Sequence, residues 1–177
     1  SSDLGWMKAQ IGADRLTRTD EARKLADMLR AFDHLPKPVI AKVNGQAYGG
    51  GVGLLSVADS AVAADHARFG LTEVRLGLIP ATISPYVAAK LGRARSREVF
   101  FSGARFDAGE AVRIGLVRRA VAAEGLDEAV EAEIRPYLDA APGAVGAAKA
   151  LLERLTDPID EGVIAMSVAA LADQWET

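Results

Sequence analysis

Cysteine is absent from this chain of 177 residues, and histidine occurs only twice, at positions 34 and 66. Without cysteine the chain has no disulfide, no thiolate metal site and no cysteine nucleophile. Two imidazoles exclude a histidine-rich metal centre and disfavour a Ser–His–Asp triad. We therefore expect no bound metal.

A strong charge of either sign is also missing. The chain has 21 Lys and Arg against 24 Asp and Glu, a formal net charge of −3, so no general positive field attracts nucleic acid or an anionic membrane. The longest run without charge or proline around the glycine-rich segment, residues 43–58, is too short to span a bilayer. Residues 1–4 lack the features of a signal peptide. We expect a cytoplasmic protein that binds neither nucleic acid nor membrane.

Half of the residues are apolar and a quarter are charged, which is typical of a globular protein with enough apolar side chain to form a core. The hydrophobic periodicity predicts strands at 39–43, 60–64, 67–71 and 116–121, and helices at 3–10, 20–34, 52–58, 84–91, 96–101 and 108–114. Later in the chain it predicts only helices, at about 126–140, 144–155 and 161–175. We therefore predict an α/β unit, residues 1–122, and a helical region, residues 123–177.

The ends of the predicted helix at 20–34 are marked by capping residues. Thr17 or Thr19 is the expected N-cap. Prolines 36 and 38 prevent the helix from continuing, and His34 is the expected C-terminal cap. The sequence therefore assigns His34 a structural role.

Residues 45–53 form the most informative segment, a glycine-rich turn between a predicted strand and a predicted helix. Such a turn allows a ligand to approach backbone N–H groups at a helix N-terminus, where the dipole favours negative charge. Either a phosphate or an oxyanion on a polarised carbonyl fits this geometry. No Lys follows the glycines, and Leu54 stands where a dinucleotide fingerprint needs glycine. The oxyanion fits better than the phosphate, and tight helix–strand packing remains a structural explanation.

Glu73 is a single acid within a mostly apolar second segment, residues 69–80. If it is desolvated there, its pKa rises, as a general acid or base at neutral pH requires. A surface carboxylate paired with Arg75 or Arg68 explains the same residue. Taken alone, the pattern favours this simpler interpretation.

Together the two segments resemble the crotonase family, the enoyl-CoA hydratase/isomerase superfamily. The pattern Asn-Gly-x-Ala-x-Gly-Gly-Gly at 44–51 is followed by Phe-Gly-x-x-Glu-x-x-x-Gly-x-Ile-Pro at 69–80. Blocks at 3–7, 102–117 and 141–152 also match in order, so the resemblance covers essentially the whole chain. It implies a crotonase-like (ClpP/crotonase) α/β fold, with a ββα spiral core and a C-terminal helical oligomerisation region. The family's opening strands precede the block at 3–7, so the resemblance implies that this N-terminal part is absent here.

The resemblance assigns site roles position by position. Gly50 and Ser2 match the two residues whose backbone N–H groups bind the thioester oxygen, although Ser2 departs from the family's usual residue. Glu73 matches the family's second catalytic glutamate, whereas Gly53 matches the first and cannot act as an acid. Further substrate-binding positions implied by the resemblance are Trp6, Tyr48, Pro80 and Ala81. Candidates to replace the missing acid are Tyr48, Thr72 and Ser84, each of which is also explained by packing or a turn.

The same resemblance implies an acyl-CoA substrate, with coenzyme A as part of that substrate and no separate cofactor. Two N–H groups stabilise enolate charge while Glu73 moves a proton or activates water. Residues 48–54 and 73–86 are most similar to the bacterial methylglutaconyl-CoA hydratase branch of leucine catabolism, which implies hydration of a short branched enoyl-CoA. A double-bond isomerase that uses Glu73 alone and a non-catalytic acyl-CoA-binding or assembly subunit are the alternatives. The family also implies homotrimers or dimers of trimers.

Overall fold

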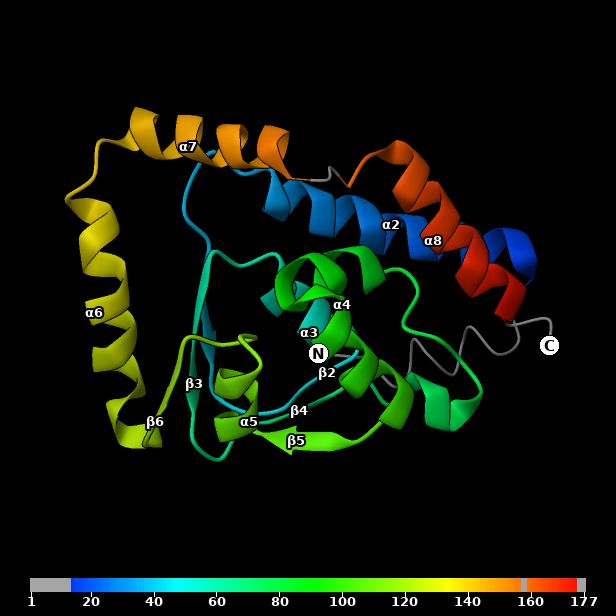
Figure 1. The fold of residues 1–177 in the computed structure, drawn as a ribbon, viewed down its shortest axis with the longest axis horizontal. Coiled ribbons are helices and arrows are strands. Elements are labelled where there is room, and N and C mark those ends of the chain that lie inside the picture. The colour runs from blue at the N-terminus through cyan, green and yellow to red at the C-terminus, as the bar shows by residue number, and fades with distance from the viewer. Residues whose placement is uncertain (1–13, 157–158, 175–177) are drawn as a thin grey trace.

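The computed structural model describes residues 14–156 and 159–174, and Figure 1 shows how the elements are arranged. The helices are α2 (Arg15–Asp33), α3 (Gly50–Ser56), α4 (Ser84–Ser102), α5 (Ala108–Arg113), α6 (Leu126–Leu138), α7 (Pro142–Leu155) and α8 (Glu161–Gln174), with 3-10 turns η1 (Glu73–Leu76) and η2 (Ala123–Gly125). The strands are β1 (Ile40–Val43), β2 (Ala47–Tyr48), β3 (Ser60–Ala64), β4 (Arg68–Gly70), β5 (Arg105–Asp107) and β6 (Arg119–Val121). The elements predicted within these residues are confirmed with shifted ends, and the helix predicted at 3–10 lies outside them. The helices predicted at 84–91 and 96–101 are the two parts of α4, which is kinked at Gly92.

Two small sheets form the α/β part of the described chain. One has the order β1-β3-β6 with parallel pairing throughout, and the other has the order β2-β4-β5. In the second sheet β2 and β4 are parallel, whereas β4 and β5 are antiparallel. The short strands β2 and β5 were not predicted, because two or three residues are too few to show an alternating pattern.

The central strand β3 is buried along its whole length, as expected for a parallel strand that is covered on both faces. Val62 and Ala64 pack against Leu126 of α6. Ala61 and Ala63 belong to the main core instead. Figure 1 shows α6 running beside β3, so this helix closes one face of the first sheet.

Helix α2 begins earlier than predicted, because Asp14 rather than Thr17 or Thr19 is its N-cap. The Asp14 carboxylate accepts a hydrogen bond from the Thr17 N–H at 2.8 Å, and aspartate is as good a capping residue as threonine. The Thr19 hydroxyl instead donates to the Arg15 carbonyl. The C-terminal cap is confirmed as His34, whose backbone N–H donates to the Arg30 carbonyl.

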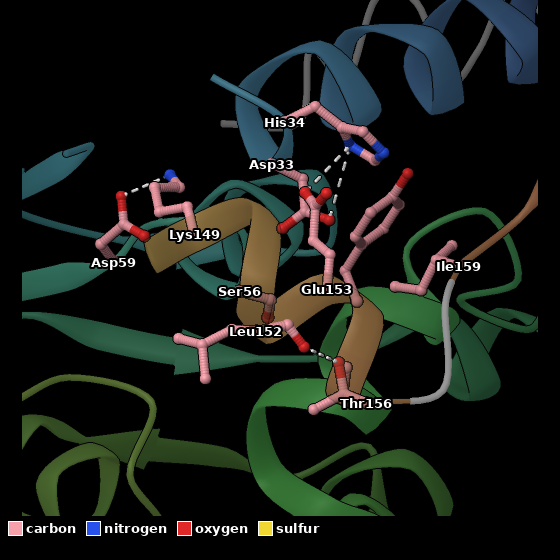
Figure 2. A pocket seen from close by; sticks show the side chains of 11 residues that line it. Asp33, His34, Ser56, Asp59, Lys149, Leu152, Glu153, Thr156 and Ile159 are labelled. Carbon is pink, nitrogen blue, oxygen red and sulfur yellow. Dashed lines mark hydrogen bonds and ion pairs between the residues drawn. The ribbon is translucent and has the colours of Figure 1, made fainter. Parts of the chain in front are cut away.

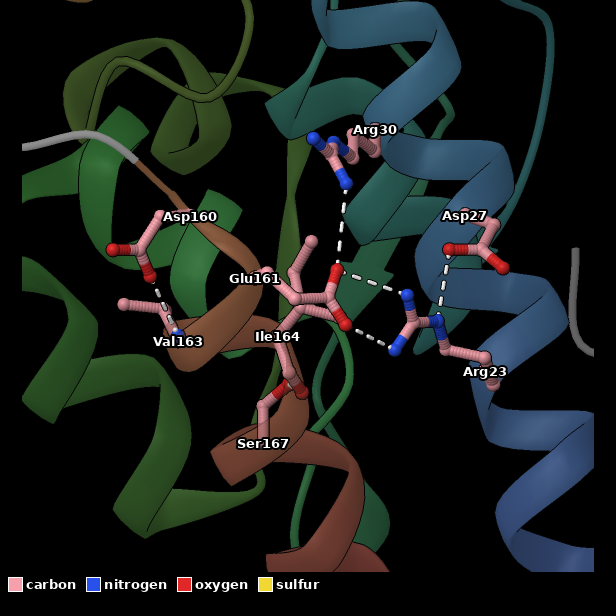
Figure 3. A network of polar contacts seen from close by, with 8 residues as sticks. All are labelled: Arg23, Asp27, Arg30, Asp160, Glu161, Val163, Ile164 and Ser167. Carbon is pink, nitrogen blue, oxygen red and sulfur yellow. Dashed lines mark hydrogen bonds and ion pairs between the residues drawn. The ribbon is translucent and has the colours of Figure 1, made fainter.

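Helix α8 returns to α2, and the two lie side by side in Figure 1. Ile164 and Val168 of α8 pack on Ala22 and Ala26 of α2. Glu161 also bridges two α2 arginines, with Arg23 Nη2–Oε2 at 2.9 Å and a longer contact to Arg30, as Figure 3 shows. These ionic groups are largely exposed, so the apolar contact is the main source of stability.

The six strands of the described chain end at Val121, and α6, α7 and α8 follow. Because α6 packs on β1 and β3 and α8 packs on α2, the helical region is joined closely to the α/β part. The domain boundary at residue 122 stays a prediction. None of the helices within residues 14–156 and 159–174 has the length and apolarity that a membrane span needs.

We expect Ile164→Ala to lower the free energy of unfolding by about 2–5 kcal/mol, because it leaves a hollow between α2 and α8. The matched variant Glu161→Gln, which removes an exposed ion pair on the same helix, should cost only about 0–1 kcal/mol. Urea unfolding of both variants measures the difference. Equal losses would contradict the dominance of apolar packing.

Candidate active site

The parallel pairing of β2 and β4 brings together, at one sheet edge, the segments that lead to Gly50 and Glu73. Tyr48 ends β2 and pairs with Gly70, which ends β4. The Gly49 N–H also donates to the Gly70 carbonyl at 3.1 Å. Because carboxyl ends of parallel strands lie at the same edge of a sheet, the chain leaving β2 toward Gly50 and the chain leaving β4 toward Glu73 start from neighbouring points.

The turn before α3 has a backbone conformation that requires glycine. Gly49 has φ 49° and ψ −114°, a combination that residues with a side chain avoid. Helix α3 then begins at Gly50, and the first N–H groups of a helix lack an intrahelical acceptor. The Gly50 N–H donates no hydrogen bond to another described residue. Apart from its chain neighbours and the backbone of its own helix, no atom of the described residues lies within 4 Å of where a Gly50 Cβ would stand. The structure therefore presents an available amide beside open space.

Glu73 is held at the first position of the turn η1. The Leu78 N–H donates to the Glu73 carbonyl at 3.1 Å, and Gly77 closes the turn in a left-handed conformation. The side chain of Gln174, at the end of α8, donates to the Gly77 carbonyl at 3.0 Å. The C-terminal helix therefore contacts the turn that carries Glu73.

The Glu73 side chain is partly buried, and its Oε2 atom is inaccessible and has no hydrogen-bond partner among residues 14–156 and 159–174. Burial raises the pKa of this carboxyl above its ordinary value of 4.5. No ion pair joins Glu73 to Arg68 or Arg75, and the Arg68 guanidinium donates instead to the carbonyls of His66 and Ala67. The surface ion-pair interpretation of Glu73 is therefore wrong.

Gly53 lies inside the core and not beside open space. A Cβ on Gly53 would stand 2.6 Å from Ile83 Cγ2 and 3.0 Å from Ile83 Cβ. Real Cβ atoms do not approach other carbons this closely. Ile83 was not among the predicted site residues, because its contact with Gly53 joins two segments that are thirty residues apart in the sequence.

The structure gives the other predicted site residues within the described ranges different surroundings. Pro80 and Ala81 are buried in the segment between η1 and α4, and the Tyr48 ring lies 5.2 Å from the Arg105 guanidinium carbon. Of the candidates for the missing acid, the Ser84 hydroxyl is occupied by a hydrogen bond to the Pro80 carbonyl at 2.6 Å. Thr72 precedes η1 without a side-chain capping bond. Ser2 and Trp6 lie outside the described residues.

The enoyl-CoA hydratase/isomerase family model matches residues 5–174. The Mycobacterium tuberculosis protein EchA17, named as a probable enoyl-CoA hydratase, is 41% identical over 133 residues, which are 73% of this chain and 50% of that protein. The carnitinyl-CoA dehydratase of Citrobacter koseri is 38% identical over 139 residues, 77% of this chain and 53% of that protein. The chain therefore spans about half the length of these curated relatives.

Solved structures are also similar. An enoyl-CoA hydratase from Shewanella pealeana superposes with a TM-score of 0.84 at 35% identity, covering 97% of this chain and 64% of that chain. An enoyl-CoA hydratase from Mycobacterium avium has a TM-score of 0.84 at 30% identity, and the match covers 92% of this chain and 64% of that chain. The crotonase-like α/β fold class predicted from the sequence is confirmed.

A hollow of about 270 Å³ lies beside Ser56, the last residue of α3, and Figure 2 shows the charged and apolar side chains that line it. His34 Nδ1 stands 3.9 Å from a carboxylate oxygen of Asp33 and 3.9 Å from one of Glu153. Lys149 pairs with Asp59 at 2.8 Å. Within the described ranges no group of three or more His, Asp or Glu residues is arranged to hold a metal ion. The hollow was not predicted, because its walls come from distant parts of the sequence.

Burial in this hollow raises the pKa of Asp33 above its ordinary value of 3.8, with His34 and Lys149 opposing the rise and Glu153 and Asp59 adding to it. A carboxyl whose folded pKa is raised stabilises the fold below its unfolded pKa, and this stability is lost as pH rises through the folded pKa. We therefore expect Asp33→Asn to raise Tm at pH 7. The gain should disappear below about pH 4, near the unfolded value.

Thermal melting at both pH values checks this expectation. The matched control is Glu131→Gln on the exposed side of α6, which should leave Tm unchanged. A Tm for Asp33→Asn below that of the parent protein at pH 7 would contradict the prediction.

Proposed function

The chain belongs to the enoyl-CoA hydratase/isomerase family, and on this premise we propose that the complete protein adds water to, or removes it from, an α,β-unsaturated acyl-CoA thioester. The observation that supports this most is the common sheet edge from which the free Gly50 amide and the partly buried Glu73 carboxyl both extend. An N–H donor and a titratable carboxyl of raised pKa are the two groups that enolate chemistry on a thioester requires.

In this proposal the Gly50 N–H binds the thioester oxygen, and Ser2 supplies the second N–H by its match to the family. The two donors stabilise the negative charge that develops on that oxygen when the neighbouring carbon gains or loses a proton. Removal of one such donor typically costs about a hundredfold or more in rate. The open space next to Gly50 among the described residues leaves room for a substrate near this amide.

Glu73 is proposed to move the proton. Because burial raises its pKa, the carboxyl is closer than an exposed glutamate to gaining and losing a proton at neutral pH. Its Oε2 atom is inaccessible to solvent and accepts no hydrogen bond from a described residue, so no structural contact among these residues uses this oxygen. The rate should therefore fall as pH drops through the raised pKa of Glu73.

For the substrate we propose a short branched enoyl-CoA, with 3-methylglutaconyl-CoA as the first choice and a role in leucine catabolism in the cytoplasm. The support is the sequence of residues 48–54 and 73–86. Acyl-group contacts are assigned to Trp6, Tyr48, Pro80 and Ala81. Coenzyme A enters as part of the substrate, and no further cofactor is proposed. The glycine at position 53 favours a second candidate, a double-bond isomerase that uses Glu73 alone.

We expect Glu73→Gln to lower turnover at least about a hundredfold, because an amide cannot exchange a proton at neutral pH. The complete protein is incubated with 3-methylglutaconyl-CoA, crotonyl-CoA and a 3-enoyl-CoA. The variant should melt at or above the parent Tm at pH 7, since it removes a carboxyl whose burial disfavours its charge.

Glu124→Gln, an exposed glutamate of η2, is the matched control and should keep full turnover. Conversion of the 3-enoyl-CoA alone would indicate the isomerase. Binding without turnover of any substrate would indicate a non-catalytic acyl-CoA-binding or assembly subunit, and near-normal turnover by Glu73→Gln would contradict the site assignment.

The complete protein is further proposed to form a closed homotrimer, commonly paired into a dimer of trimers. Leucines of α7 support this proposal because two of them remain exposed on one face of that helix, four residues apart: Leu151 by 55% and Leu155 by 71%. Exposed apolar side chains that lie together mark a partner surface. Light scattering at micromolar concentration should give a trimeric or hexameric mass, and Leu155→Lys should lower it. A monomeric mass for the parent protein would exclude the proposal.

A further inference from the structure

Ile83 fills the volume into which any side chain of residue 53 would have to extend. A Cβ at position 53 would stand 2.6 Å from Ile83 Cγ2 and 3.7 Å from Leu29 Cδ1. Both of these side chains belong to the main core, with Ile83 3% and Leu29 0% exposed. The glycine is therefore enclosed by apolar carbon and faces no open space.

This contact cannot be relieved by a small side-chain movement. The close atoms are Cβ and Cγ2 of a β-branched residue, which are fixed by the backbone and by one strongly preferred rotamer. Ile83 also directly precedes α4 and accepts a hydrogen bond from the Val87 N–H at 3.1 Å, so its backbone is held by the first turn of that helix. A side chain at position 53 would overpack the core, and a charged one would also be buried without a partner.

The surroundings of Glu73 are consistent with an isolated acid. Its pKa is raised by burial, and no charged group of the described residues contributes to the rise. A second carboxylate close by would have raised it further through repulsion. The packing at Gly53 and the electrostatics at Glu73 thus independently indicate that the described residues place no second acid beside Glu73.

We infer that Gly53 and Ile83 are a matched pair that keeps an acidic side chain out of position 53, so that the proposed hydration runs on Glu73 without a second carboxylate from this position. The inference rests on the proposed function and extends it to the number of proton-transferring groups. In this proposal Ile83 influences the reaction because it keeps an acidic side chain out of position 53. It does not itself contact the reacting atoms.

The chemistry of a one-carboxylate hydration balances. The Glu73 carboxylate removes a proton from water while the water oxygen forms a bond to the β-carbon of the enoyl group. The electron pair of the C=C bond moves toward the α-carbon and thioester oxygen, where the N–H donors stabilise the enolate. The protonated Glu73 then gives the same proton to the α-carbon. One water is added, and the carboxylate is regenerated.

The pairing is tested by a double-mutant cycle on the complete protein. Gly53→Ala should lower Tm by about 5 °C because the new methyl overpacks against Ile83. Ile83→Ala should also lower Tm because it leaves a hollow. The double variant should lose less than the sum, since the methyl introduced at position 53 enters the volume that the Ile83 side chain vacates.

Gly143→Ala is the matched control, because no atom lies within 4 Å of its Cβ position in α7, and it should keep or raise the parent Tm. An unchanged Tm for Gly53→Ala, or losses that add in the double variant, would overturn the pairing. This result does not depend on the identity of the substrate.

Hydrogen exchange at the α-carbon of a saturated short acyl-CoA in D2O tests whether Glu73 is the base in both exchange and hydration. The parent protein should exchange this hydrogen and hydrate the enoyl-CoA, and Glu73→Gln should lose both activities at least about a hundredfold. Retained exchange in Glu73→Gln with hydration lost would reveal a second base, which overturns the inference and leaves the proposed function standing. A parent protein that shows neither activity would overturn both.

Discussion

The parallel pairing of β2 with β4 is the contact on which the candidate site depends. It joins only two residue pairs, Ala47 with Phe69 and Tyr48 with Gly70. The Gly49 N–H continues the ladder by donating to the Gly70 carbonyl. Immediately beyond this point one chain enters α3 through Gly50, and the other enters the turn that carries Glu73. A shift in this register would separate the amide from the carboxyl that the proposed chemistry needs together.

Three neighbouring glycines serve different physical purposes around this edge. Gly49 supplies a backbone conformation that side-chain-bearing residues avoid. Gly50 leaves open space beside an amide, and Gly53 leaves room for Ile83 to pack against the backbone of α3. The sequence Gly-Gly-Gly-x-Gly therefore combines a turn, a binding position and a packing position within five residues.

Buried apolar contacts stabilise the fold, whereas the partial burial of the Glu73 carboxyl costs stability and raises its pKa. The contacts of Ile164 and Val168 with α2 bury apolar surface and hold the C-terminal helix in place, and Gln174 at the end of that helix contacts the Glu73 turn. Glu73 itself is buried at a cost, since its Oε2 finds no partner among the described residues. Such a cost is typical of a group retained for reactivity, because reactivity depends on the same raised pKa.

The sequence alone determined most element types and the family to which the chain belongs. Helical and alternating periodicities are local properties, so α2, β1, β3 and α5 to α8 could be predicted, and the ordered blocks around Gly50 and Glu73 identified the family. The sequence did not identify Asp14 as the N-cap of α2, because aspartate and threonine have similar preferences for that position. Only the tertiary structure decided between a surface ion pair and a buried carboxyl for Glu73, since that depends on packing by distant segments. It also decided why position 53 is glycine: Ile83 stands thirty residues later in the sequence, and no local pattern reports a contact that forms only when α3 and the start of α4 pack together.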